Sequence, residues 1–194
     1  MSYIIVGYYT ENTGYAEESK NLTNSLEKLK LPYDVIAVPN QGSWQANTQY
    51  KAYFIKQMMI KHFPKDLLYL DVDAVVHKTP VLFDAVTFDI GVHYMRSTEL
   101  ISSTIYLRNN SKISILIERW ITTCLKNPDI WDQKVLQSVI NQSKDLFLKV
   151  GNLPPEYCKI FDIMAVIQDP VIEQFQASRR FKQQIDNPES KEVP

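Results

Sequence analysis

The chain has 194 residues, of which 45% are hydrophobic and 22% are charged, the balance of a globular protein and not of a disordered one. This length fits one domain with a substantial core and leaves little room for a second. The formal net charge is -1, so no global positive field points to a nucleic-acid partner, although a local basic patch stays open.

The amino terminus and the cysteines indicate an intracellular protein. Residues 1–7 contain neither a basic leader nor a long apolar region, so we expect a first strand there and not a signal peptide. No apolar run approaches the ~20 residues that a membrane span requires. Cys124 and Cys158 lack the spacing of a metal-binding pair, and we expect two reduced, packed thiols. These features predict a cytoplasmic location.

Strands and helices alternate in the first 70 residues. β-branched and aromatic runs predict strands, and apolar residues at helical spacing predict helices that end before Pro32 and Pro64. The predicted order is strand, helix, strand, helix, strand, over residues 3–9, 15–29, 33–38, 46–62 and 67–70. The last of these strands is almost wholly apolar, which is typical of a strand buried on both faces of a parallel sheet.

After Pro80 the pattern becomes less regular. We expect strands over 88–94, 101–107 and 171–175, and helices over 111–125, 131–141 and 176–185. The sequence therefore predicts an α/β fold with one mainly parallel central sheet flanked by helices. A Rossmann-like nucleotide-binding half would occupy residues 1–84, a more irregular half residues 85–185, and a polar tail residues 186–194.

Two aspartates separated by one residue, Asp71 and Asp73, follow the third predicted strand directly. In parallel α/β sheets, ligands bind just beyond the carboxyl ends of the strands, which is where this pair lies. Two hard oxygen ligands there can hold Mg²⁺ or Mn²⁺, and the ion can bridge the phosphates of a nucleotide. The alternative is a strand end with solvated aspartates, or an Asx turn without a ligand.

The region from Trp44 to Phe83 resembles the nucleotide-diphospho-sugar transferases, which are glycosyltransferases of the GT-A fold. The matching segments in this region are Lys51, Phe54-Ile55, Leu68 to Asp73 and Pro80 to Phe83. Two further matches lie later in the chain, at Trp131-Asp132-Gln133 and at Leu153 to Tyr157. The resemblance implies a single GT-A-like domain over residues 1–185. It also implies that the Asp-x-Asp motif, Asp71-Val72-Asp73, binds a divalent metal and the donor diphosphate.

The resemblance implies roles for residues of the first half. Tyr9 and Thr10 would receive the base and the ribose of the donor. Lys51 would either neutralise a phosphate or orient Asp71, with a solvated surface lysine as the alternative. Trp44 would either stack near the nucleotide or pack its own loop.

Residues of the second half would meet the sugar. The segment Ser102–Thr104 would present small polar groups to the donor sugar, unless it is only a strand edge. Asp132 would bind sugar hydroxyls or act as a base toward the acceptor. Gln133 would orient the sugar ring or lie behind the anomeric carbon.

The closing segment departs from the family pattern. Related transferases often end with a histidine that completes the metal shell, followed by a glycine and a lysine. The corresponding residues here are Gln174, Ala177 and Arg180. Gln174 would offer a carbonyl oxygen as the third metal ligand, and Arg180 would grip the diphosphate, with Arg179 as an equally good phosphate partner.

We therefore expect metal-assisted transfer of a sugar from a nucleotide diphosphate donor, with a UDP-sugar favoured by the resemblance. The sequence leaves the acceptor open between a saccharide, a lipid-linked glycan, a protein side chain and a modified nucleobase. The first alternative is a non-catalytic GT-A-like module that binds a nucleotide or a partner protein. The second is a haloacid-dehalogenase-type phosphatase with Asp71 as the nucleophile and Asp73 as the acid/base. That enzyme needs a later acidic pair, for which Asp162 and Asp169 are poor candidates.

Overall fold

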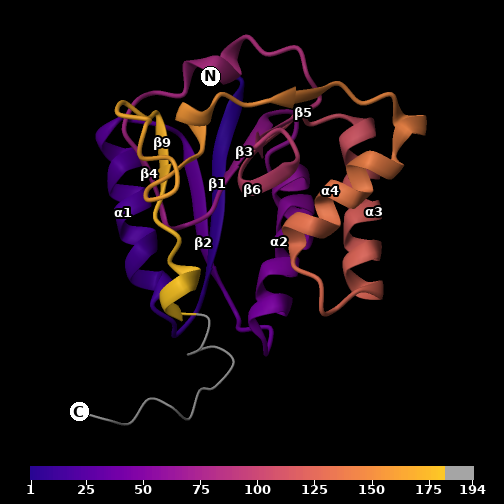
Figure 1. The fold of residues 1–194 in the computed structure, drawn as a ribbon, viewed down its shortest axis with the longest axis horizontal. Helices are drawn as coiled ribbons and strands as arrows, with labels where there is room; N and C mark the ends of the chain where they lie inside the picture. The colour runs from indigo at the N-terminus through magenta and orange to yellow at the C-terminus, as the bar shows by residue number, and fades with distance from the viewer. Residues whose placement is uncertain (182–194) are drawn as a thin grey trace.

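A mixed sheet of six strands runs through the middle of the protein (Figure 1). The computed structural model describes residues 1–181. The strands are β1 (Tyr3–Thr10), β2 (Tyr33–Val38), β3 (Asp66–Leu70), β5 (Ile90–Met95), β6 (Glu99–Leu107) and β7 (Val150–Asn152). Their order in the sheet is β2-β1-β3-β6-β5-β7, and β6 alone runs antiparallel to its neighbours. The predicted α/β fold with a mainly parallel sheet is confirmed.

Helices cover both faces of the sheet (Figure 1). They are α1 (Tyr15–Lys28), α2 (Trp44–Lys61), α3 (Ser111–Lys126) and α4 (Asp132–Gln142), with 3-10 turns at Val81–Asp84, Lys144–Leu146 and Pro155–Tyr157. The helix α1 lies on one face, and α2, α3 and α4 pack together on the other. Side chains of β1 alternate between the two cores: Ile4 and Val6 face α2, whereas Tyr3 and Ile5 face α1. The strand is apolar throughout because both of its faces are buried.

The start of α2 is two residues earlier than the sequence predicts. Ser43 caps the helix, because its side chain accepts a hydrogen bond from the backbone N–H of Ala46 at 3.1 Å. The first turn therefore includes Trp44, whose side chain is thereby placed at the carboxyl edge of the sheet. Among residues 1–181, no helix is both long enough and apolar enough to cross a membrane.

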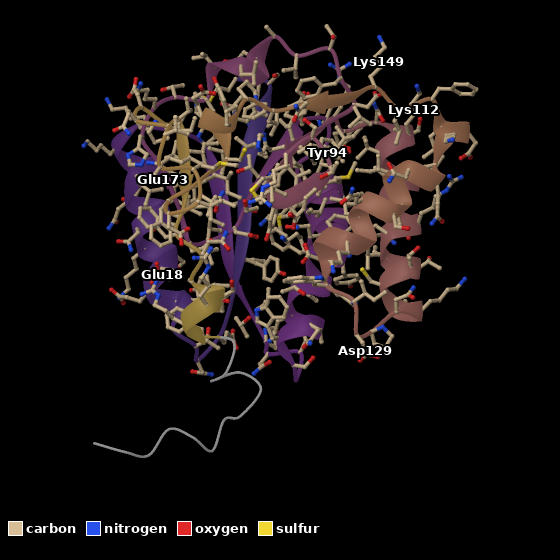
Figure 2. The ribbon with its side chains drawn as sticks, in the orientation of Figure 1. Glu18, Tyr94, Lys112, Asp129, Lys149 and Glu173 are labelled. Carbon is tan, nitrogen blue, oxygen red and sulfur yellow. The ribbon has the colours of Figure 1, made fainter. Side chains whose placement is uncertain are left out.

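A second, three-stranded sheet is the main feature that the sequence did not predict. It contains β4 (Ala74–Val76), β8 (Lys159–Ile160) and β9 (Ile172–Gln174) in the order β4-β9-β8. Of these, only β9 lies in a predicted strand. Glu173 on β9 (Figure 2) accepts from His77 at 2.9 Å and pairs with Lys159 at 2.8 Å, so it connects β9 to the residue after β4 and to the first residue of β8.

The small sheet brings the closing segment to the Asp-x-Asp motif. Ala74 pairs with Gln174, and the backbone N–H of Phe175 donates to the Asp73 carbonyl at 3.1 Å. The predicted helix over 176–185 begins at residue 178 and is described to residue 181. The rest of that helix and the predicted tail at 186–194 lie outside the described residues.

Candidate active site

The carboxyl ends of β1, β2 and β3 meet at one edge of the sheet, toward the bottom of Figure 1. Gly7 lets β1 approach the end of β3, because a Cβ at this position would lie 2.8 Å from the Leu70 carbonyl oxygen. Asp71 and Asp73 follow in the turn between β3 and β4. The turn is held by the N–H of Asp71, which donates to the Ser103 carbonyl at 2.9 Å, and by the N–H of Ala74, which donates to the Asp71 carbonyl at 3.0 Å.

A cavity of about 290 Å³ opens beside this turn. Most of the predicted site residues line it, namely Tyr9, Thr10, Trp44, Lys51, Asp71, Val72, Asp73, Ser102, Ser103, Asp132 and Gln133. Thr104, Gln174, Arg179 and Arg180 do not. Val72 is 4% exposed and belongs to the core on the α1 side. Its predicted contact with the donor would therefore have to come mainly from its backbone.

Lys51 joins two carboxylates from distant parts of the chain. Its Nζ lies 2.9 Å from Asp132 Oδ2 and 3.1 Å from Asp71 Oδ1, and its side chain is 5% exposed. The same ammonium donates to the carbonyl and hydroxyl oxygens of Ser102 at 3.1 and 3.2 Å. Burial alone would lower the pKa of Lys51, but Asp132 and Asp71 raise it more, so the ammonium keeps its charge.

These contacts decide between the roles predicted for Lys51. An ammonium has three donors, and all of them are occupied by oxygens of the protein. Lys51 is therefore neither a solvated surface lysine nor free to grip a phosphate. Orientation of Asp71 is the predicted role that this geometry supports, and orientation of Asp132 is added to it.

Tyr69 is a neighbour of Asp71 that the sequence analysis missed. Its hydroxyl donates to Asp71 Oδ1 at 2.8 Å, and its side chain is 1% exposed. Burial, followed by the charge of Asp71, raises the pKa of Tyr69 well above its usual value, so the phenol stays protonated. The signal was present, because residues two apart on a strand point to the same face of the sheet.

Asp73 is the second carboxylate of the motif. Its Oδ2 accepts the backbone N–H of Ala177 at 2.6 Å, which ties the motif to the closing segment. Burial, followed by the charge of Asp71, raises the pKa of Asp73 to about 7. A bound cation would relieve this repulsion, and two carboxylates are hard oxygen donors of the kind that Mg²⁺ and Mn²⁺ prefer. The donor set therefore fits a divalent ion.

The number of acidic ligands is small. Among residues 1–181, no three His, Cys, Asp or Glu side chains gather at a point where they could hold a metal. A cation held by Asp71 and Asp73 would need its other ligands from water and from the phosphates of a bound nucleotide. This arrangement is usual for Mg²⁺ at phosphate sites.

Asp132 and Gln133 begin α4 and also line the cavity. Oδ2 of Asp132 is taken by Lys51 and by the Ser102 hydroxyl, which donates to it at 2.9 Å. Within the described chain, Oδ1 of Asp132 has no hydrogen-bond partner, so it can accept from a ligand hydroxyl. The Gln133 amide donates to Glu99 Oε1 at 3.3 Å.

Aromatic side chains form another wall, only part of which the sequence analysis anticipated. Trp44 is 8% exposed, and its ring meets that of Trp131 edge-on with the centroids 5.7 Å apart. The side chains of Trp44 and Tyr15 form a hydrogen bond, and Tyr15 lies close enough to Asp73 for that charge to raise its pKa further, after burial. Trp44 therefore both packs its loop and lines the cavity. Trp131 and Tyr15 also line the cavity, and neither was assigned a site role from the sequence.

The structure does not bring Gln174 into the cavity. Its side chain is fully buried, and its amide nitrogen donates to the Ser103 carbonyl at 3.1 Å and to the Thr104 hydroxyl at 3.0 Å. Its amide oxygen has no partner among the described residues. In this position Gln174 joins β9 to β6, and it is not placed as the predicted third metal ligand.

Arg180 is also outside the cavity lining. Its guanidinium donates to Glu18 on α1 (Figure 2) at 2.7 Å, and its side chain is 58% exposed. To grip a diphosphate, as predicted, it would have to leave Glu18. Arg179 is paired with Asp162, so the alternative phosphate partner is engaged as well.

The acidic pair that a haloacid-dehalogenase-type phosphatase needs is not at this cavity. Asp162 pairs with Arg179, and Asp169 pairs with Lys78. Neither aspartate is part of the cavity lining. This geometry gives no support to the phosphatase alternative.

Comparison with known proteins identifies the class of fold. No family profile matches the chain, and no curated protein sequence matches it. Solved structures, in contrast, do match the chain. A glycosyltransferase involved in the glycosylation of the major capsid of PBCV-1 aligns with a TM-score of 0.70 at 14% identity, over 95% of this chain and 98% of that one.

Two further glycosyltransferase structures align over 89% of this chain. They are GlyE of Streptococcus pneumoniae TIGR4, with a TM-score of 0.61 and 13% identity, and the bifunctional WbbM, with a TM-score of 0.61 and 12% identity. The aligned regions cover 54% of GlyE and 45% of WbbM. The protein therefore has the single-domain α/β fold of GT-A-like glycosyltransferase structures, and at these identities the similarity establishes the fold alone.

Proposed function

We propose that this protein is a metal-dependent glycosyltransferase that moves a sugar from a nucleotide diphosphate donor to an acceptor. The observation that carries the proposal is the buried Lys51 bridge, which joins Asp71 of the Asp-x-Asp turn to Asp132 inside one cavity. The cavity lies at the carboxyl edge of the parallel strands, where nucleotides bind in α/β sheets. The fold is that of known glycosyltransferases.

The charges of the cavity suit this reaction. Breaking the bond between the anomeric carbon and the diphosphate leaves positive charge on the sugar and negative charge on the leaving group. A divalent cation, when bound, supplies Lewis-acid stabilisation of that leaving group. Asp71 and Asp73 would hold the cation, and Lys51 keeps Asp71 and Asp132 in fixed positions, so little reorganisation is needed during the reaction.

The remaining residues would position the donor. Tyr9 and Thr10 at the end of β1 would receive the base and the ribose, with UDP favoured by the sequence resemblance. Oδ1 of Asp132 would accept a hydrogen bond from a hydroxyl of the sugar, and Gln133 would lie beside the sugar ring. Trp44 would close the cavity at the nucleotide end.

A non-catalytic nucleotide-binding module is the second candidate. It is favoured by the position of Gln174 outside the cavity, which leaves the third metal ligand expected from the resemblance out of the site. Both candidates predict that Mn²⁺ and UDP together stabilise the protein. Only the enzyme predicts slow, Mn²⁺-dependent hydrolysis of a nucleotide sugar.

Calorimetry with Mn²⁺ and UDP tests the shared part of the proposal. Asp73→Asn should abolish metal-dependent binding of UDP while the fold survives. The matched control is Asp169→Asn, which removes a carboxylate that is 80% exposed and outside the cavity. If Asp73→Asn binds UDP as tightly as wild type in the presence of Mn²⁺, Asp73 is not a metal ligand. Tighter binding of guanosine or cytidine diphosphate would contradict the preference for UDP.

A further inference from the structure

Two different donors converge on a single oxygen of Asp71. The Tyr69 hydroxyl donates to Oδ1 at 2.8 Å, and the Lys51 ammonium lies 3.1 Å from the same atom. No described residue donates to Oδ2. The carboxylate of Asp71, which lines the cavity, is therefore held asymmetrically. Oδ1 accepts from two protein donors, whereas Oδ2 accepts from none of the described residues.

Lys51 alone does not determine this orientation. Its ammonium is shared with Asp132 and with Ser102, so its pull on Asp71 is divided among several oxygens. The Tyr69 hydroxyl, in contrast, has Asp71 as its acceptor. As a neutral donor, it also orients the carboxylate without cancelling the negative charge that a cation needs.

The Tyr69 ring is itself fixed. It is 1% exposed, its centroid lies 6.3 Å from that of Tyr8 and 6.2 Å from that of Phe54, and Lys51 Nζ lies 5.1 Å from its centre. A rigid ring can hold its hydroxyl at one point, which a flexible side chain cannot do. Partners of this kind, behind a metal ligand, commonly change metal affinity when they are removed.

We propose that Tyr69 is a positioning residue, which orients Asp71 so that Oδ2 is the oxygen presented to a divalent cation. The inference rests on the metal site of the proposed function and extends it to a residue that does not touch the ion. Tyr69 would act only through Asp71. Its contribution should therefore appear in metal affinity and not in the stability of the fold alone.

Tyr69→Phe isolates the hydroxyl, because the ring and its contacts with Tyr8, Phe54 and Lys51 are retained. The matched control is Tyr8→Phe, which removes a buried hydroxyl in the same aromatic cluster that donates to the Asn47 carbonyl at 2.6 Å. The measurement is calorimetric titration of each folded variant with Mn²⁺ in the presence of UDP, which supplies the phosphate ligands, accompanied by its thermal unfolding midpoint. The Kd for Mn²⁺ should rise on the order of tenfold or more in Tyr69→Phe. It should stay within about twofold of wild type in Tyr8→Phe.

Each outcome decides the proposal. Wild-type affinity for Mn²⁺ in Tyr69→Phe overturns it, and so does an equal loss in both variants, which would indicate a general effect of packing. Failure of the wild-type protein to bind Mn²⁺ in the presence of UDP overturns both the role of Tyr69 and the metal site. If Tyr69→Phe selectively weakens Mn²⁺ but no nucleotide sugar is hydrolysed, the inference stands and the proposed transferase activity fails.

Discussion

The Nζ atom of Lys51 lies 2.9 Å from Oδ2 of Asp132, with both side chains at least nine-tenths buried. The two residues belong to different halves of the chain, one in α2 and the other at the start of α4. Their ion pair, extended to Asp71, connects the part of the cavity that would hold the diphosphate with the part that would hold the sugar.

Removal of Lys51 should be strongly destabilising. Lys51→Met leaves the buried Asp132 carboxylate and the Ser102 carbonyl without their common donor, and breaking a buried ion pair costs about 3–5 kcal/mol. The free energy of unfolding from urea titration measures this loss. The control is Lys56→Met, which removes an exposed ion pair with Glu118 that should contribute only about 0–1 kcal/mol. Equal losses in the two variants would mean that the buried bridge has no special role.

The stability that protonated Asp73 contributes to the metal-free protein should be lost as the pH rises from about 4 to about 7. The pKa of Asp73 is raised from 3.8 to about 7 in the folded state, so in this window the folded protein binds a proton that the unfolded chain releases. The contribution of Asp73 to the free energy of unfolding therefore falls with pH, and this loss is complete above the folded pKa. Urea titrations in a chelator across the window measure how the free energy of unfolding changes with pH. This slope should be more negative in wild type and in Asp169→Asn than in Asp73→Asn, and identical slopes would contradict the raised pKa.

Gln174 should matter for stability more than for metal binding. Gln174→Ala removes a donor to the Thr104 hydroxyl, and an unsatisfied buried group of this kind costs about 1–3 kcal/mol. The Ser103 carbonyl loses one donor but keeps the backbone N–H of Asp71. Mn²⁺ affinity measured by calorimetry should change by less than about twofold. The earlier expectation from the resemblance is tested by Gln174→His. Tighter Mn²⁺ binding with a pH dependence near the histidine pKa of about 6.5 would indicate that residue 174 can act as a metal ligand.

Arg180 should contribute little to nucleotide affinity, because its guanidinium is engaged with Glu18 and largely exposed. Arg180→Ala should leave the calorimetric Kd for UDP in the presence of Mn²⁺ within about threefold of wild type. Loss of roughly 1.5–3 kcal/mol of binding free energy is expected instead if the charged hydrogen bonds to a diphosphate are real. Glu18→Gln, which releases the guanidinium, separates the two cases, since it should strengthen binding only if Arg180 can reach the phosphates.

The sequence predicted the first half of the fold well for a physical reason. Strands β1 and β3 are buried on both faces, so their apolar runs are unambiguous, and Pro32 and Pro64 mark where the helices between strands end. The strand β4 was missed because it has only three residues, and its existence depends on pairing with β9 from the far end of the chain. Local patterns contain no information about such a partner.

The candidate site shows the same contrast between residues that local patterns predict and residues whose roles depend on distant partners. The spacing of Asp71 and Asp73 after an apolar strand located the motif, and the structure places both at the cavity. Gln174 and Arg180 were assigned from an alignment of the closing segment, which gives positions along the chain but not side-chain directions. The side chain of Gln174 turns toward Ser103 and Thr104 of β6, and Arg180 meets α1. The central role of Lys51 could not be read from sequence, because it depends on Asp132 in another element.

The most direct test of the proposed function is hydrolysis of a panel of nucleotide sugars by the wild-type protein and by Asp73→Asn, each with Mn²⁺ and with a chelator. Slow release of free sugar from at least one donor, UDP-sugars being favoured, is expected only for wild type with Mn²⁺. The Asp169→Asn variant should behave like wild type. If Mn²⁺ and UDP stabilise the wild-type protein but no donor is hydrolysed, the protein is a binding module. If hydrolysis persists in Asp73→Asn or in the chelator, the metal-dependent mechanism is contradicted.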